Sequence, residues 1–167
     1  ISDRLALVAT FPQLEYPRAA PEPNTHVVGP LLWEPEFGEV ELPDGDGPLV
    51  LVAPSTAQDA RHRLLRAALD GLGALPGVRV LATWNRRPLD AEDGPWRVAP
   101  NTRLVEWVSY ARTMPRCDVV VCHAGHGTLV RALASGCAVV CAPAAGDMNE
   151  DAARGDWAGA AGRRPRR

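Results

Sequence analysis

The stretch Val119-Val-Val-Cys-His123-Ala-Gly125-His-Gly127-Thr128 decides how this chain folds. Its apolar residues predict a buried strand, its glycines a tight turn, and a helix from Gly127 to Ser135 is expected directly afterwards. Glycines let the backbone approach a ligand closely, and the free N–H groups of a helix's first turn attract an anion. The stretch therefore predicts a diphosphate site at the end of a buried strand.

The side chains of this stretch suggest how a phosphate would be held. His123 follows the strand at its carboxyl end, where open α/β sheets place their ligands. We expect its ring at the mouth of the site, with little core packing, donating to a phosphate oxygen. Two alternatives are a structural turn with an incidental histidine and a metal site of Cys122, His123 and His126. The metal site is weaker, because adjacent strand residues point to opposite faces.

Strands and helices alternate along the rest of the chain. Apolar runs predict strands at Leu49–Ala53, Val78–Ala82, Thr102–Glu106, Asp118–Cys122 and Ala138–Ala142. Further helices are expected after an N-cap at Ser55 or Thr56, with Asp59 in the first turn, and over Tyr110–Met114 and Asp147–Trp157. This alternation indicates an α/β fold, a Rossmann-like parallel sheet with helices on both faces.

The composition excludes several classes of function. The net charge of −2 gives no basic field for nucleic acid, and the arginine cluster at 163–167 is interpreted as a solvated tail. Lysine is absent, which excludes Schiff bases, pyridoxal phosphate enzymes and a Walker A loop. No apolar run approaches the roughly 20 residues of a membrane span, so a cytoplasmic protein is expected. No disulfide framework is expected among the four cysteines, and Cys122 and Cys141, in apolar runs, are interpreted as small hydrophobes.

The motif His123–Thr128 and the residues after it resemble the donor-binding signature of family 1 glycosyltransferases. The matching run continues through Ala134-Ser-Gly-Cys-Ala-Val-Val-Cys-Ala-Pro143 to Asp147. Members of this family transfer sugars from nucleotide diphosphates and have two Rossmann-like domains, the GT-B fold. The nearest branch is the bacterial one that decorates natural products such as macrolides. The resemblance begins near residue 49 and implies the C-terminal, donor-binding half of a GT-B fold.

The resemblance implies which residues hold the diphosphate of the donor. The group expected to contact or cradle it consists of His123, Gly125, Gly127, Thr128 and, on the loop after the first strand of the domain, Ser55 and Thr56. The donor would be a UDP- or dTDP-sugar. No cofactor and no metal are expected, since the nucleotide sugar is itself a substrate.

The same resemblance implies the base and sugar contacts. Trp107 matches the tryptophan that stacks on the pyrimidine, and the Val108 backbone would bond the base edge; stacking of this kind contributes about 1–3 kcal/mol. Asp147 matches the carboxylate that binds sugar hydroxyls, a charge-assisted contact. From the residues alone, Trp107 could instead belong to the core, and Asp147 could be the N-cap of the last helix.

Several positions depart from the family pattern. Ser109 and Tyr110 stand where many members have Pro and Gln, so base selection through that Gln is in doubt. Met148 replaces a common Gln, which suggests a deoxygenated sugar or a relaxed hexose site. Asp151 stands where Asn is usual.

The resemblance also implies a domain organisation. Residues 1–30, with predicted strands Leu5–Ala9 and His26–Val28, resemble the end of an N-terminal acceptor domain. Residues 31–48 have the Pro-, Gly- and acid-rich composition of a linker. Residues 49–167 form the donor domain, with arginines where a closing apolar strand is expected.

Two consequences follow for the rest of the molecule. The general base, a histidine of the acceptor domain, has no counterpart, so no catalytic residue is expected and the chain is interpreted as a fragment or a decayed gene product. The two N-terminal strands are expected to pair with the donor sheet's edge or, in a homodimer, with a second copy.

Three functional hypotheses remain open. The first is the donor half of an inverting glycosyltransferase that acts on a small natural-product-like acceptor, bound through the missing domain. The second is a catalytically inactive nucleotide-binding or partner module derived from such an enzyme. The third is a different nucleotide-binding Rossmann domain, against which stands the absence of Gly-x-Gly-x-x-Gly after an early strand.

Overall fold

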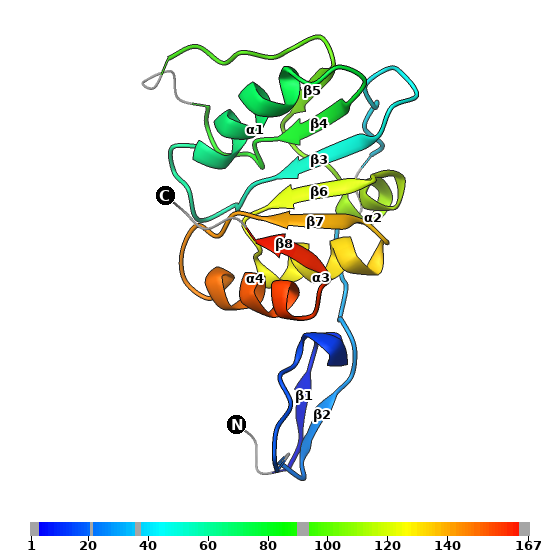
Figure 1. Cartoon of the computed structure of the whole chain (residues 1–167), viewed down its shortest axis with the longest axis vertical. Helices are drawn as coiled ribbons and strands as arrows, with labels where there is room; N and C mark the ends of the chain where they lie inside the picture. Colours follow the sequence, from blue (N-terminus) through cyan, green and yellow to red (C-terminus); the bar gives the residue numbers. More distant parts are fainter. Residues whose placement is uncertain (1–3, 21, 36–37, 90–93, 164–167) are drawn as a thin grey trace.

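A six-stranded parallel sheet forms the body of the molecule (Figure 1). The computed structural model describes residues 4–20, 22–35, 38–89 and 94–163. The strand order is β5-β4-β3-β6-β7-β8. The strands are β3 Leu49–Ala53, β4 Arg79–Thr83, β5 Thr102–Val105, β6 Val119–Cys122, β7 Ala138–Cys141 and β8 Ala161–Arg163. The helices are α1 Arg63–Gly73, α2 Tyr110–Thr113, α3 His126–Ala134 and α4 Met148–Trp157, and η2 Met114–Arg116 is a 3-10 turn.

Both faces of the sheet are covered, as the sequence predicts. All five residues of β3 are buried; Leu49, Leu51 and Ala53 belong to one apolar cluster and Val52 to another. Leu51 packs in the cluster that also holds Leu129 of α3 and Ala152 of α4. Val52 packs in the other, with Leu65 and further residues of α1. The continuous apolar runs in the sequence arise because a parallel strand between two helix layers has no solvent face.

The register of β3 and β6 positions the carboxyl edge of the sheet. Ala53 pairs with Cys122, so the two central strands end side by side. At the opposite end the Leu49 amide donates to the Asp118 carboxylate at 2.7 Å, and the Asp118 amide donates to the Leu49 carbonyl at 2.9 Å. The segments after β3 and β6 therefore leave the sheet at the same place.

The helix after β3 begins later than predicted. The expected N-cap at Ser55 or Thr56 is wrong: α1 starts at Arg63. The Ser55 hydroxyl accepts from the amides of residues 57 and 58 at 3.2 and 3.0 Å, and this local turn competes with a helix. Asp59 and His62 then adopt left-handed φ values of 64° and 52°. The Asp59 carboxylate accepts from the Leu64 amide at 2.9 Å and so serves the start of α1.

The last described residues form a strand that the sequence does not predict. Residues Ala161–Arg163 form β8 beside β7, in parallel register from Val139↔Ala161 to Cys141↔Arg163. An edge strand of this kind tolerates small and charged side chains because one of its edges faces away from the sheet. The arginines at 164–167, interpreted as a solvated tail, lie outside the described residues.

The two N-terminal strands pair with each other. β1 Ala6–Val8 and β2 Thr25–Val27 form a separate two-stranded parallel sheet, with the 3-10 turn η1 Pro12–Leu14 between them. We call residues 4–20 and 22–30 the N-terminal unit; it lies beside α4 (Figure 1). The expectation that these strands join the edge of the main sheet is wrong, and a homodimer through them stays a prediction.

The contact between this unit and α4 is small. Leu14 is buried, and Tyr16 meets Trp157 edge to face with ring centroids 5.2 Å apart. Arg154 reaches across from α4: its guanidinium donates to the Leu14 carbonyl at 3.3 Å and pairs with Glu15 at 2.9 Å.

The cysteines behave as small hydrophobes. All four are free, as predicted, and all four are buried. Burial raises the pKa of the Cys117 thiol to about 12, so this thiol stays protonated at neutral pH. Across the described part of the chain, none of the helices has the length and apolar character needed to cross a membrane.

The linker contains a glycine that the fold requires. A Cβ built on Gly47 would lie 1.7 Å from the carbonyl oxygen of Gly77, on the turn before β4. Gly47→Ala is therefore expected to lower the free energy of unfolding by about 1–3 kcal/mol, because backbone must move on both sides. Chemical denaturation measures this change.

Gly71 provides the matched control for that substitution. Nothing lies within 4 Å of a Cβ built there, in the last turn of α1. Gly71→Ala is expected to raise stability by about 0.5–1 kcal/mol through helix propensity. Equal stability of the Gly47→Ala variant and the parent would contradict the close approach of the two backbones.

Candidate functional site

A cavity of about 280 Å³ opens where β3 and β6 end. Two loops form most of its wall, one after each strand. They bring together six of the sequence-predicted residues, namely Ser55, Thr56, His123, Gly125, Gly127 and Thr128. We call this the main cavity.

His123 is more deeply placed than the sequence suggests. Its Nδ1 accepts a hydrogen bond from the Ser55 amide at 2.8 Å, and its Nε2 lies 3.3 Å from the Asp59 carboxylate. Because Nδ1 is an acceptor, the proton of the neutral ring resides on Nε2 and points to Asp59. The side chains of His123 and Asp59 are 4% and 3% exposed. The expectation of a loosely packed ring at the mouth of the site is wrong, since the 55–59 turn closes over it.

The turn after β6 has the geometry of a backbone cradle. Ala124 adopts a left-handed φ of 64°, and Gly125 is the N-cap of α3. The Thr128 amide donates to the Gly125 carbonyl at 3.0 Å, whereas amides at the very start of a helix have no acceptor within it, which gives this end a partial positive charge. A Cβ on Gly127 would meet nothing within 4 Å, and one on Gly125 only Met148 at 3.9 Å. The space before these glycines is therefore open to a ligand.

Trp107 lines a second cavity, of about 250 Å³, that adjoins the main one. Tyr110, Gly127 and Thr128 line both cavities. The Arg86 guanidinium lies 5.0 Å from the centroid of the Trp107 ring, which is a cation–π distance. We call this the tryptophan cavity. The side chain of Val108 is only 1% exposed and belongs to the core.

Asp147 lines a third cavity, of about 290 Å³, between α4 and the N-terminal unit. Asp147 occupies the N-cap position of α4, as one interpretation has it, but its side chain makes no capping hydrogen bond there. His126 lines both this cavity and the main one. We call it the Asp147 cavity.

Asn85 and Tyr110 line the main cavity without a binding role in the sequence prediction. Asn85 is buried, with a left-handed φ of 51°, and its amide donates to the Pro54 carbonyl and to the Tyr110 hydroxyl. Burial raises the pKa of Tyr110 well above its usual range. Asn is enriched at left-handed backbone positions, so an Asn in a predicted loop is the sequence signal from which the role of Asn85 could be predicted.

The linker holds the helix beside the tryptophan cavity. The Glu34 carboxylate accepts from the amides of Tyr110 and Ala111, each at 2.8 Å, at the start of α2. Arg131 of α3 lies 3.9 Å from the same carboxylate. Leu31 and Trp33 thereby complete one wall of the cavity.

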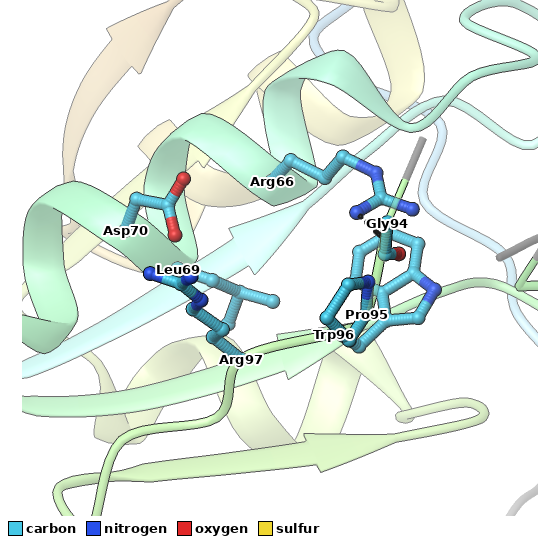
Figure 2. Close-up of a pocket in the computed structure, with 7 residues that line it drawn as sticks. All are labelled: Arg66, Leu69, Asp70, Gly94, Pro95, Trp96 and Arg97. Carbon is cyan, nitrogen blue, oxygen red and sulfur yellow. Dashed lines mark hydrogen bonds between the residues drawn. The ribbon is translucent and has the colours of Figure 1, made fainter. Parts of the chain in front are cut away.

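A further cavity, of about 250 Å³, lies against α1 (Figure 2). The Arg66 guanidinium stacks 3.9 Å from the Trp96 ring centroid and donates to the Gly94 carbonyl at 3.3 Å. Asp70 and Arg97 complete the polar part of the wall. None of the sequence-predicted site residues lines it, so it does not belong to the site at the carboxyl ends of the strands.

Comparisons with known proteins identify the domain. A family model described as UDP-glucoronosyl and UDP-glucosyl transferase matches residues 45–165. The 4'-demethylrebeccamycin synthase of Lentzea aerocolonigenes is 34% identical over 164 residues, 93% of this chain and 37% of the synthase. UDP-glycosyltransferase 2 of Phaeomoniella chlamydospora is 29% identical over 157 residues, 88% of this chain and 34% of that enzyme. The chain therefore spans little more than a third of these relatives.

Solved structures share the fold. The glycotransferase of kitacinnamycin superposes with a TM-score of 0.79 at 25% identity, over 97% of this chain and 42% of that protein. The spinosyn rhamnosyltransferase SpnG, in complex with thymidine diphosphate, has a TM-score of 0.69 at 22% identity, over 98% of this chain and 44% of that protein. These neighbours are GT-B glycosyltransferases, as predicted. The chain belongs to the UDP-glucoronosyl and UDP-glucosyl transferase family and is a glycosyltransferase-like domain akin to those of bacterial natural-product enzymes.

Proposed function

We propose that this chain is the donor-binding half of an inverting glycosyltransferase that takes a UDP- or dTDP-sugar. The observation that carries the proposal is the main cavity, in which the glycine turn before α3 faces the Ser55–Thr56 loop. An anion at the start of a helix is favoured by the free amides and by the helix dipole. The thymidine diphosphate bound by SpnG supports a nucleoside diphosphate as the ligand.

The three adjoining cavities suggest how a donor would lie. The diphosphate is assigned to the main cavity, against Gly125–Thr128. The pyrimidine is assigned to the tryptophan cavity, on Trp107 and the Val108 backbone. The sugar is assigned to the Asp147 cavity, where a carboxylate can accept two hydroxyl groups. Each assignment is supported by shared wall residues, since a donor must run from one cavity into the next.

The chemistry of transfer then divides between two parts of a protein. An acceptor hydroxyl, deprotonated by a base, attacks the anomeric carbon while the nucleoside diphosphate leaves. The part of this domain is to bind the donor and stabilise the charge that develops on the leaving phosphate. We assign residues 1–30 to an acceptor domain, 31–48 to a linker and 49–167 to the donor domain, with the base and the small-molecule acceptor on the acceptor side.

His123 serves the site in two ways in this proposal. Its ring holds the Ser55 amide and thereby the loop that carries Ser55 and Thr56. It also lines the main cavity, where, with both ring nitrogens engaged by Ser55 and Asp59, it is assigned to shape the wall that meets the diphosphate. The two roles make the histidine both a fold residue and a binding residue.

A titration of UDP and dTDP into the chain, followed by chemical-shift mapping, tests the proposal. Gly127→Val is expected to weaken diphosphate binding by about tenfold or more, because the side chain enters open space that the ligand needs. Gly71→Val is the matched control, a helical glycine with equally open surroundings but remote from the site. Equal affinity of both variants for UDP would rule out a diphosphate at the glycine turn.

Trp107→Ala separates the base from the phosphates. Loss of stacking is expected to weaken UDP binding by about 1–3 kcal/mol and to leave inorganic pyrophosphate unaffected. Calorimetry with the two ligands gives both numbers. A parallel loss for pyrophosphate would show that Trp107 shapes the phosphate site rather than carrying the base.

His123→Ala is expected to reduce both binding and stability. Removing the ring leaves the Ser55 amide and one contact of the buried Asp59 carboxylate unsatisfied, which costs roughly 1–3 kcal/mol in the free energy of unfolding. Denaturation and UDP titration of the same variant give the two readouts. Unchanged stability would contradict the buried placement, and unchanged affinity would contradict the binding role.

A further inference from the structure

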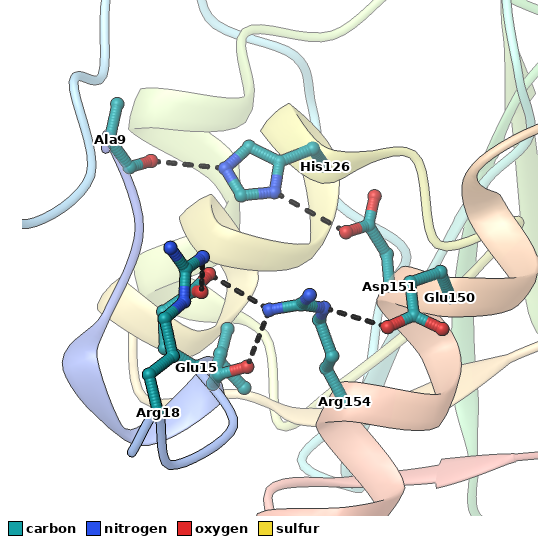
Figure 3. A network of polar contacts seen from close by, with 8 residues as sticks. Ala9, Glu15, Arg18, His126, Glu150, Asp151 and Arg154 are labelled. Carbon is teal, nitrogen blue, oxygen red and sulfur yellow. Dashed lines mark hydrogen bonds and ion pairs between the residues drawn. The ribbon is translucent and has the colours of Figure 1, made fainter. Parts of the chain in front are cut away.

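His126 is held between two hydrogen-bond acceptors from different parts of the chain (Figure 3). Its Nε2 lies 3.0 Å from the carbonyl oxygen of Ala9, in the N-terminal unit. Its Nδ1 lies 3.6 Å from the carboxylate of Asp151, on α4. A neutral imidazole carries only one N–H group, so both acceptors can be served together only by the protonated ring.

The His126 ring lies between two of the cavities described above. His126 is the first residue of α3 and directly follows Gly125, the N-cap of this helix. We call Gly125–Thr128, to which the diphosphate is assigned, the phosphate turn. His126 lines the main cavity on one side and the Asp147 cavity on the other. Val8–Thr10 form the opposite wall of the Asp147 cavity. The hydrogen bond to Ala9 therefore fastens that wall beside the turn.

We propose that His126 is a positioning residue which, by hydrogen bonding to Ala9 through one ring nitrogen and pairing with Asp151 through the other, holds the Val8–Thr10 wall of the Asp147 cavity against the phosphate turn and so couples binding of the donor's sugar to one proton. This inference rests on the proposed function, which assigns the diphosphate to the main cavity and the sugar to the Asp147 cavity. The inference concerns binding of the sugar and not of the diphosphate, because the backbone amides of the phosphate turn can donate whether or not the His126 ring is protonated.

The surrounding charges favour the protonated ring at neutral pH. The charged groups around it on α4 and on the N-terminal unit are Asp147, Glu150, Asp151, Arg154, Glu15 and Arg18. The hydrogen bond with Asp151, opposed by partial burial and aided by the Ala9 carbonyl and the charge of Asp147, raises the pKa of His126 from 6.5 to about 9. The ring thus keeps its proton at neutral pH and loses it as the pH rises through about 9.

Loss of the proton affects the two acceptors unequally. The neutral ring has one N–H left, and a carboxylate is a stronger acceptor than a peptide carbonyl. The charge of the carboxylate therefore draws the remaining N–H to Nδ1, although Nδ1 lies 3.6 Å from Asp151 and Nε2 only 3.0 Å from Ala9, and the Ala9 carbonyl then faces a ring lone pair. Arg154 still joins α4 to Leu14 and Glu15, and its guanidinium does not titrate in this range. The N-terminal unit therefore stays attached while the wall beside the turn loosens.

The test compares UDP with UDP-glucose on the full chain at pH 7.5 and pH 10. The readout is the dissociation constant of UDP divided by that of UDP-glucose, so a high ratio means that the sugar strengthens binding. Any ionisation of the uracil base, which both ligands share, cancels in this ratio. In the parent, the tighter binding of UDP-glucose is expected to diminish by about two- to tenfold between the two pH values, the equivalent of one hydrogen bond. In His126→Gln the ratio is expected to be low and the same at both pH values.

Two further variants sharpen the test. Asp151→Asn removes the carboxylate that holds the proton, so the fall in the ratio is expected at a lower pH than in the parent. His26→Gln, which removes an exposed ring from the same N-terminal unit, is expected to behave as the parent. In NMR spectra the amide signals of Val8–Thr10 are expected to shift with the same midpoint as the His126 ring.

The outcomes separate the inference from the proposed function. If UDP binds but the ratio in the parent does not change with pH, or UDP and UDP-glucose bind equally at pH 7.5, the role of His126 is overturned and the diphosphate site stands. If neither ligand binds to the parent at either pH, the proposed function fails and the inference fails with it.

Discussion

The hydrogen bond from the Ser55 amide to Nδ1 of His123 joins the ends of the two central strands. Strand register brings Ala53 beside Cys122, and the next residues could diverge, but the imidazole ring bridges them. Its other nitrogen faces the Asp59 carboxylate, which also accepts from the Leu64 amide at the start of α1. One buried ring thus fixes the loop after β3, the first turn of a helix on one face and the wall of the main cavity.

The sequence predicts the central sheet well because its signals are local and strong. Apolar runs bounded by Gly and Pro give β3, β6 and β7 within a residue or so, and the two-glycine turn at Gly125–Gly127 gives the place of the main cavity. The start of α1 is missed because the Ser55 hydroxyl competes for backbone amides that a helix would need. β8 is missed because an edge strand needs little apolar character.

The site could be predicted in kind but only partly in arrangement. Glycines, a threonine and a histidine indicate a phosphate site, yet they do not show that His123 turns inward to Asp59. That pairing depends on left-handed backbone at Asp59, which nothing in its apolar pattern signals. The bond between His126 and Ala9 joins residues far apart in sequence, and the N-terminal strands pair with each other for equally non-local reasons. Tertiary contacts of this kind leave no periodic pattern in the sequence from which they could be predicted.

Glu34 anchors the linker to the donor domain. Its carboxylate binds two amides of α2, and beyond it Val40 and Leu42 pack against the core while the Gly47 carbonyl accepts from Arg79 at 2.8 Å. Glu34 and the described stretch 38–48 are therefore attached to the donor domain, and 31–33 form the tether to the N-terminal unit. A tether so short keeps the effective concentration of one body at the surface of the other high, so contacts that would be too weak between separate molecules suffice to hold them together.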